Sequence, residues 1–195
     1  MHRGGDLTRL LGEIRGCTVC AASLPLGPRP IVQAGSGARV LIIGQAPGIR
    51  VHESGVPWDD ASGQRLREWT GIATTNFYDP ACVALMPMGF CYPGVAASGG
   101  DAPPRRECAP LWHDRLRAAL GDVRLTLLVG HHAQKAYLGR AVSMAAAVRE
   151  FAAAPGGMFP LPHPSWRSTG WMKRNPWFEA EVLPVLRGRV IAALA

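Results

Sequence analysis

Apolar side chains near the start of the chain recur with the spacing of a helix. Leucine and isoleucine lie three and four positions apart between Leu7 and Ile14, which predicts a helix over 7–15. Apolar spacing and composition predict further helices at 62–69, 107–120, 132–138 and 143–153. The tail from Pro176 also reads as helix, with an interruption or bend expected at Pro184.

Short apolar runs alternate with these helices along the chain. They predict strands at 39–43, 82–86, 125–129 and 159–161. Strands that alternate with helices form a parallel sheet covered on both faces. We therefore expect a single α/β domain over 1–195, with a central, mostly parallel four-stranded sheet flanked by helices on both faces.

Two loops follow predicted strands, and a third is unusually long. Gly44-Gln45-Ala46-Pro47-Gly48 comes directly after the first strand, and His163-Pro164-Ser165 comes after the last. Segment 89–104 is rich in Gly and Pro, and loops of that length in compact domains are usually functional. Because ligands of parallel sheets bind at the carboxyl ends of strands, we expect the first two loops to share one site.

The overall charge of the chain favours a polyanionic partner. The 195 residues carry a formal net charge of +7, almost wholly from arginine. Genome base composition can explain the preference for arginine over lysine but not the excess over acidic residues, so a nucleic acid is the expected partner. No apolar stretch approaches the roughly 18 residues of a membrane helix, and residues 1–6 lack a signal-peptide core. We therefore expect a cytoplasmic protein without a membrane partner.

Four of the five cysteines have a spacing suited to metal binding. Cys17 and Cys20 form a C-x2-C pair, and Cys91 and Cys108 flank most of the long loop. Disulfides are rare in the cytoplasm, whereas four thiolates can hold either zinc or a 4Fe-4S cluster, and spacing does not separate the two. Cys82, inside an apolar run, reads as a small buried residue.

Together, the two short loops and the four cysteines resemble the motifs of the uracil-DNA glycosylase superfamily, particularly its iron-sulfur branches, families 4 and 5. The resemblance spans roughly residues 7–186. It implies a monomeric enzyme of base excision repair that hydrolyses the N-glycosidic bond of uracil, or of other deaminated bases, in DNA and leaves an abasic site. It also favours a structural 4Fe-4S cluster over zinc at the four cysteines.

The resemblance also assigns roles around the base. Gln45, where family 4 usually has glutamate, would line the pocket together with Ala46. Trp58 lies in a stretch similar to the family's Gly-Arg-Pro-Phe and would stack on the flipped base. His163 resembles the histidine that donates to the pyrimidine oxygen as negative charge develops, and Met86 completes the expected base-binding residues.

Two departures from the family concern the attacking water and base recognition. Family 1 uses an aspartate where this chain has Ala46. When the flanking residues are aligned, Glu53 is the expected water-positioning residue, with His52 as the alternative and Asp60 third, although each could equally be a solvated loop residue. Family 4 has a base-reading asparagine where this chain has Pro87, so the base would be read by backbone groups or a wider range of bases would be accepted.

Residues after His163 are expected to contact DNA. Ser165 and the backbone after it can hold a phosphate, and Trp166 and Arg167 stand where the family carries residues that enter the duplex. Lys173 and Arg174 add positive charge suited to phosphate contact.

Two other functions remain open. Ala46 and Pro87 are compatible with a damage-binding member of the superfamily that is weakened or inactive in catalysis. A zinc-stabilised nucleotide-binding protein would retain the cysteines but would have no use for His163-Pro164-Ser165. Adjacent His131 and His132 are expected to point apart and to have a structural or phosphate-side role.

Overall fold

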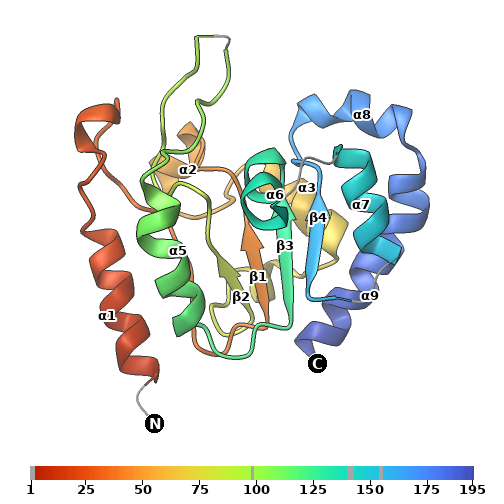
Figure 1. The fold of residues 1–195 in the computed structure, drawn as a ribbon, viewed down its shortest axis with the longest axis horizontal. Coiled ribbons are helices and arrows are strands. Elements are labelled where there is room, and N and C mark those ends of the chain that lie inside the picture. The colour runs from red at the N-terminus through yellow and green to blue at the C-terminus, as the bar shows by residue number, and fades with distance from the viewer. Residues whose placement is uncertain (1–2, 98, 140–142, 154–155) are drawn as a thin grey trace.

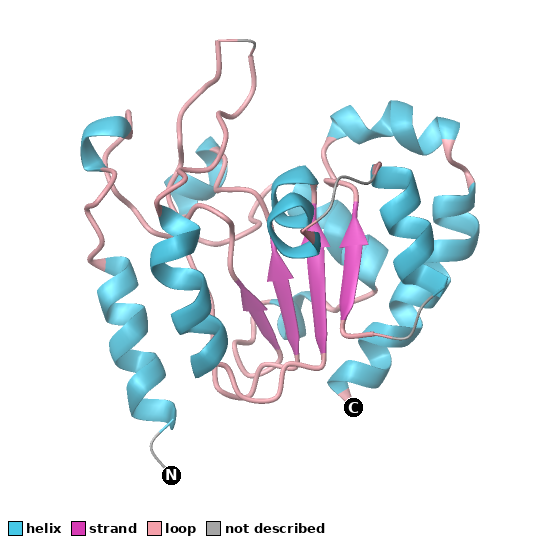
Figure 2. Ribbon diagram, in the orientation of Figure 1, coloured by secondary structure: helices cyan, strands magenta, loops and turns pink. Residues whose placement is uncertain are grey.

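Four parallel strands form the centre of the computed structural model (Figure 2). The structure describes residues 3–97, 99–139, 143–153 and 156–195. The strands are β1 (Val40–Ile43), β2 (Val83–Leu85), β3 (Leu125–Val129) and β4 (Met158–Leu161). Their order across the sheet is β2-β1-β3-β4, and every neighbouring pair is parallel. The predicted α/β fold with a four-stranded sheet is confirmed.

Helices cover both faces of this sheet. α3, α7 and α9 contribute to the apolar cluster on one face, and α1, α5 and α6 to the cluster on the other (Figure 1). Their bounds are α1 (Arg3–Arg15), α3 (Ala61–Thr70), α5 (Cys108–Ala119), α6 (His131–Leu138), α7 (Met144–Ala153) and α9 (Leu183–Leu194). Within the described ranges, no helix is both long enough and apolar enough to cross a membrane.

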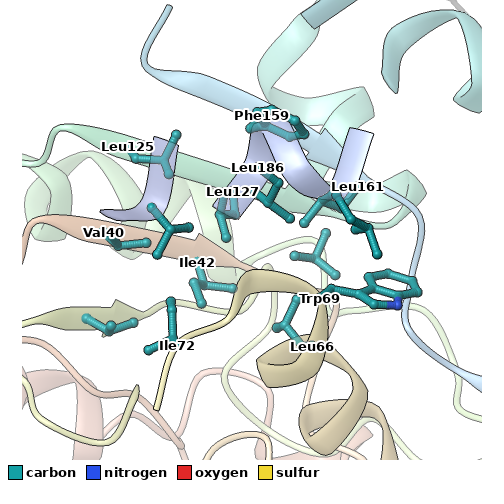
Figure 3. Close-up of a cluster of buried hydrophobic side chains, with 14 of the residues drawn as sticks. Val40, Ile42, Leu66, Trp69, Ile72, Leu125, Leu127, Phe159, Leu161 and Leu186 are labelled. Carbon is teal, nitrogen blue, oxygen red and sulfur yellow. The ribbon is translucent and has the colours of Figure 1, made fainter. Parts of the chain in front are cut away.

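Successive side chains of β1 enter opposite cores, as the two-residue repeat of a strand requires. Val40 and Ile42 pack with Leu66 of α3 in the first cluster (Figure 3). Leu41 and Ile43 belong to the second cluster, between the sheet and the helices of the opposite face. All four residues of β1 are buried, which explains why the strand reads as an uninterrupted apolar run in the sequence.

Short helical segments connect the main elements. They are α2 (Ile49–Ser54), α4 (Thr74–Phe77), α8 (Thr169–Arg174) and 3-10 turns at Ala21–Ser23 and Trp166–Ser168. Apolar spacing does not predict them, because segments of three to six residues contain too little of a 3.6-residue period.

The helical tail is interrupted next to Pro184, as expected from the sequence. A π-helical turn at Phe178–Val182 leads into α9, and Pro184 lies in the first turn of α9. The first helical turn leaves N–H groups without intrahelical partners, so a residue that lacks an N–H fits there at no cost.

The helix predicted at 62–69 begins at Ala61. Its N-cap is Asp60, whose Oδ1 accepts a hydrogen bond from the Gly63 N–H at 2.7 Å. One local expectation is wrong. Cys82 is only half-buried and precedes β2, where its Sγ donates to Asp79 Oδ2 over 3.5 Å. The polar partner Asp79, three residues earlier in the chain, explains why Cys82 is not simply a core residue.

Candidate active site

A cavity of about 660 Å³ opens at the carboxyl ends of the strands. The loop after β1 and the loop after β4 both line it, so the two short loops do meet at one site. The long loop 89–104, which extends beyond this edge of the sheet, contributes Gly100 and Asp101 (Figure 1). Other walls are formed by residues that precede α3, follow β2 and begin α6.

Trp58 forms an aromatic wall that two glycines make possible. A β-carbon on Gly44 would lie 2.6 Å from Trp58 Cζ2, and one on Gly63 would collide with the Trp58 carbonyl oxygen. The backbone of Trp58 has a φ of 59°, which is strained for a bulky residue. Its carbonyl oxygen accepts a hydrogen bond from the Tyr78 hydroxyl at 3.3 Å. The indole is therefore held in place by its surroundings.

His163 lies next to Trp58 in the wall of the cavity. The two ring centroids are 5.9 Å apart, with an interplanar angle of 30°. Close approach to Gly130 and a 2.6 Å hydrogen bond from Ser168 Oγ to the His163 carbonyl oxygen fix this loop. Burial lowers the pKa of His163, while the charge of Asp60 opposes the shift. The imidazole is therefore neutral at neutral pH, with one N–H to donate.

Gln45, in the loop after β1, contacts the long loop. The carbonyl oxygens of Gly44 and Gln45 accept hydrogen bonds from the Met88 and Gly89 N–H groups, which extends the pairing beyond β1 and β2. Gln45 Nε2 donates to the Ala102 carbonyl oxygen over 3.5 Å. Gln45 and the adjacent Ala46 both line the cavity.

Pro87 lines the cavity without offering a free backbone polar group. Proline has no N–H, and the Pro87 carbonyl oxygen accepts a hydrogen bond from His113 Nε2 at 3.1 Å. His113 Nδ1 in turn accepts from the Tyr137 hydroxyl at 2.7 Å. Burial lowers the pKa of His113 and raises the pKa of Tyr137 to about 12, so both are neutral at neutral pH. The wall at Pro87 is apolar towards the cavity.

Three residues that the sequence places at the reaction centre lie away from the cavity lining. Met86 is fully buried in the second core cluster. The His52 ring is buried beside Tyr92, with ring centroids 5.9 Å apart, and Glu53 is exposed. The carbonyl oxygens of His52 and Glu53 both accept hydrogen bonds from Arg29. The structure does not bring these side chains to the cavity.

The expected DNA-contacting residues divide into two groups. Ser165, Trp166 and Arg167 line the cavity, and Trp166 is 75% exposed. Lys173 and Arg174 are exposed on α8 and are not part of the cavity wall. The first group is therefore at the mouth of the site, whereas the second lies beside it.

The histidine pair at the start of α6 was expected to point apart, and this expectation is wrong. The rings of His131 and His132 are 5.7 Å apart and edge-on, and both residues line the cavity. They occupy the first turn of a helix, where neighbours diverge by about 100° and not by the 180° of a strand. Burial lowers the pKa of His132, and the charges of His131 and Lys135 lower it further.

The four cysteines proposed as ligands occupy one region beside the site. Burial raises the pKa of Cys20, Cys91 and Cys108, the last to about 12, and charge interactions among the four raise these values further. N–H groups approach three of the sulfurs: the Phe90 N–H lies 3.3 Å from Cys108, Arg29 hydrogen-bonds to Cys91, and Arg105 to Cys20.

This donor set suits an iron-sulfur cluster, whose thiolates commonly accept N–H hydrogen bonds. No group of three or more Cys, His, Asp or Glu within the described residues is arranged to hold a metal ion. The assignment of a cluster therefore depends on the chemistry and the shared neighbourhood of the thiols.

A model of the family described as "Uracil DNA glycosylase superfamily" matches residues 32–187. The chain belongs to the uracil DNA glycosylase superfamily. The matched range includes the loops after β1 and β4 and the long loop, which all line the cavity. Cys17 and Cys20 precede the matched range.

Superfamily membership indicates DNA glycosylase chemistry at this cavity. Asp101 also lines the cavity, and the sequence around it does not predict this position. The length and the Gly and Pro content of its loop were the only signal, and they do not identify which side chain faces the cavity.

Proposed function

We propose that this protein is a monomeric DNA repair glycosylase that removes uracil and other deaminated bases from DNA by hydrolysing the N-glycosidic bond, which leaves an abasic site. The observation that carries the proposal is that Trp58 and His163 lie side by side in the wall of one cavity, with ring centroids 5.9 Å apart. A stacking surface next to a hydrogen-bond donor suits a flipped base, which stacks on the first and accepts a hydrogen bond from the second.

His163 is suited to stabilise the departing base. Negative charge develops on the base oxygen as the glycosidic bond breaks, and a fixed N–H in a site with little water stabilises such charge strongly. Because burial lowers the pKa of His163, its imidazole donates this hydrogen bond as a neutral group. Trp58 supplies an apolar stacking surface beside it.

The Pro87 wall supports acceptance of more than one base. A pocket discriminates strongly when its own polar groups must be satisfied by the correct ligand, and the Pro87 carbonyl is already engaged by His113. The cavity of about 660 Å³ also has room for a base larger than uracil. We therefore include hypoxanthine and xanthine among the proposed substrates.

Positive and aromatic residues at the rim suit a DNA duplex from which a base has been extruded. Trp166 is exposed, and the Arg167 guanidinium lies 5.4 Å from its ring centroid. A planar side chain of this kind can occupy the vacated base stack. Lys173 and Arg174 extend the positive surface along α8, where phosphates would lie.

The proposal includes a 4Fe-4S cluster held by Cys17, Cys20, Cys91 and Cys108. When bound, it would supply a structural cross-link and no redox step, since glycosidic hydrolysis transfers no electrons. The cross-link would join the segment after α1 to the start of the long loop and to α5. Zinc at the same thiolates is the alternative.

Oligonucleotides containing uracil, hypoxanthine or xanthine, single-stranded and double-stranded, test the proposal when alkaline treatment reveals abasic sites. We expect cleavage at uracil and at one or more of the other bases. His163→Ala should lower the single-turnover rate by about 10²-fold or more, on the scale of a lost oxyanion donor. Thermal unfolding of the variant close to that of the wild type would show that its fold is intact.

An inactive, damage-binding member is the second candidate, because the loop from Gly44 to Gly48 contains no carboxylate. Tight binding to damaged DNA without cleavage at any base would favour it and would contradict the enzyme proposal. An unchanged rate in His163→Ala would remove this imidazole from the mechanism.

A further inference from the structure

Hydrolysis of an N-glycosidic bond needs a group that orients a water and accepts its proton. The loop after β1, from Gly44 to Gly48, carries no carboxylate that could do this. Among the described residues that line the cavity, the carboxylates are those of Asp60 and Asp101. One of these two carboxylates is therefore the candidate for activating the water.

Asp60 already has a structural partner. Its Oδ1 accepts the 2.7 Å hydrogen bond from the Gly63 N–H that caps α3. This oxygen satisfies an N–H group at the start of the helix that has no intrahelical partner, so it is committed to the cap. Asp60 is thus better suited to hold α3 and the adjacent Trp58 than to take a proton from water.

Asp101 is placed directly over the loop after β1. Its Oδ2 lies 3.2 Å from the position that a β-carbon on Gly48 would occupy. The hydrogen bond from Gln45 Nε2 to the Ala102 carbonyl oxygen joins the same two loops one residue further along. Within the described ranges, the Asp101 carboxylate has no hydrogen-bond partner, so its oxygens are available to a water.

The backbone around Asp101 is held by a short hairpin. Val95 and Asp101 form an antiparallel bridge. On either side, the Ala96 N–H donates to the Gly100 carbonyl oxygen and the Ala102 N–H to that of Gly94, both at 2.8 Å. These bonds fix the direction in which the Asp101 side chain leaves the loop.

Charges from two other loops act on this carboxylate. Partial burial raises the pKa of Asp101, and the negative charge of Asp60 raises it further. Arg167, whose guanidinium packs against Gly100, opposes both effects. A carboxylate that is more basic than usual is a better proton acceptor for water.

We infer that Asp101, on the long loop 89–104, is the catalytic base that activates the attacking water, in place of the carboxylate absent at Ala46. The water oxygen bonds to the anomeric carbon of the deoxyribose, and the bond from that carbon to the base nitrogen breaks with its electron pair leaving on the base. The proton lost by water passes to Asp101 and then to the departing base or to solvent. This inference rests on the proposed function.

Single-turnover excision by Asp101→Asn, compared with the wild type, tests this role. Asparagine keeps the shape of aspartate but cannot accept the proton, so we expect a fall of about 10²-fold or more in rate. Affinity for DNA containing an abasic-site analogue, measured by fluorescence anisotropy, should be unchanged. Asp114→Asn is the matched control, because this carboxylate on α5 is 97% exposed and outside the cavity wall.

The outcomes separate this inference from the proposed function. Excision by the wild type together with a wild-type rate in Asp101→Asn would overturn the inference alone, and a simultaneous loss in Glu53→Gln would assign the water to Glu53. A parallel loss of rate and DNA affinity in Asp101→Asn would make Asp101 a binding residue and would also overturn it. If the wild type excises no base, the proposed function fails and the inference fails with it.

Discussion

At the scale of single residues, two glycines, Gly44 and Gly63, leave room for the aromatic wall of the cavity. The Trp58 indole occupies the space where a β-carbon on Gly44 would be, at 2.6 Å from Cζ2. Because the Trp58 backbone is strained and its carbonyl is hydrogen-bonded to Tyr78, the ring has little freedom to move aside. The glycine after β1 is therefore needed for the aromatic wall, in addition to its place in a turn.

Gly44→Ala should displace the Trp58 ring and reduce both excision and stability. Forcing a methyl group into a packed site typically costs about 1–3 kcal/mol. Gly12→Ala is the matched control, because a β-carbon there meets no atom within 4 Å and alanine favours the helix. Thermal unfolding and single-turnover excision measure the two effects, and a fully active Gly44→Ala would contradict the fixed position of Trp58.

At the scale of elements, the sequence predicts the strands and the longer helices, whose apolar residues follow a regular spacing. It misses local structure that depends on contacts between residues distant in the chain. The strands and the six main helices follow from apolar spacing, and the two short loops are located by the strands that they follow. The hairpin that positions Asp101 depends on hydrogen bonds between Ala96 and Gly100 and between Ala102 and Gly94, which no local pattern encodes.

Similar reasons explain why some residues predicted to be at the site lie outside the cavity. Met86 follows an apolar strand and alternates into the core, and Glu53 lies on α2, a helix of six residues that is too short to be recognised. The loops could be assigned to one site from the sequence, but the direction of each side chain could not.

The proposed cluster would cross-link the segment after α1, the long loop and α5, so its loss should affect stability. Cys91→Ser should abolish the broad visible absorption of an iron-sulfur protein and reduce stability by about 2 kcal/mol or more, which is roughly 4–8 °C in a chain of this size. Cys82→Ser is the control, because this thiol lies outside the four and should leave iron content and colour unchanged. A colourless wild-type protein with stoichiometric zinc would contradict the cluster.

At the scale of the whole molecule, buried histidines make folding sensitive to acid. His113, His132 and His163 all have pKa values lowered by burial. The folded state therefore binds fewer protons than the unfolded state below the unfolded pKa of about 6.5. Stability is fully present above that value and is lost as the pH falls towards the folded pKa values.

We expect the free energy of unfolding, measured with urea, to decrease as the pH falls from about 7 to 5. His113→Gln should make this dependence shallower, because glutamine can still donate to the Pro87 carbonyl but takes up no proton in the unfolded state. A change in the free energy of unfolding that is the same at every pH does not affect this test, since the comparison is between slopes. Identical slopes in the two proteins would show that His113 does not contribute.

The apolar wall at Pro87 also affects which step must distinguish damaged bases from normal ones. A pocket that selects by shape alone separates similar ligands by factors of roughly 10–200, far below the 10⁴ or more that unsatisfied polar groups can impose. Normal bases vastly outnumber damaged ones in a genome, so discrimination of that size would be insufficient by itself. Most of the protection of intact DNA would then come before the pocket, from the greater cost of extruding a correctly paired base than a mismatched one.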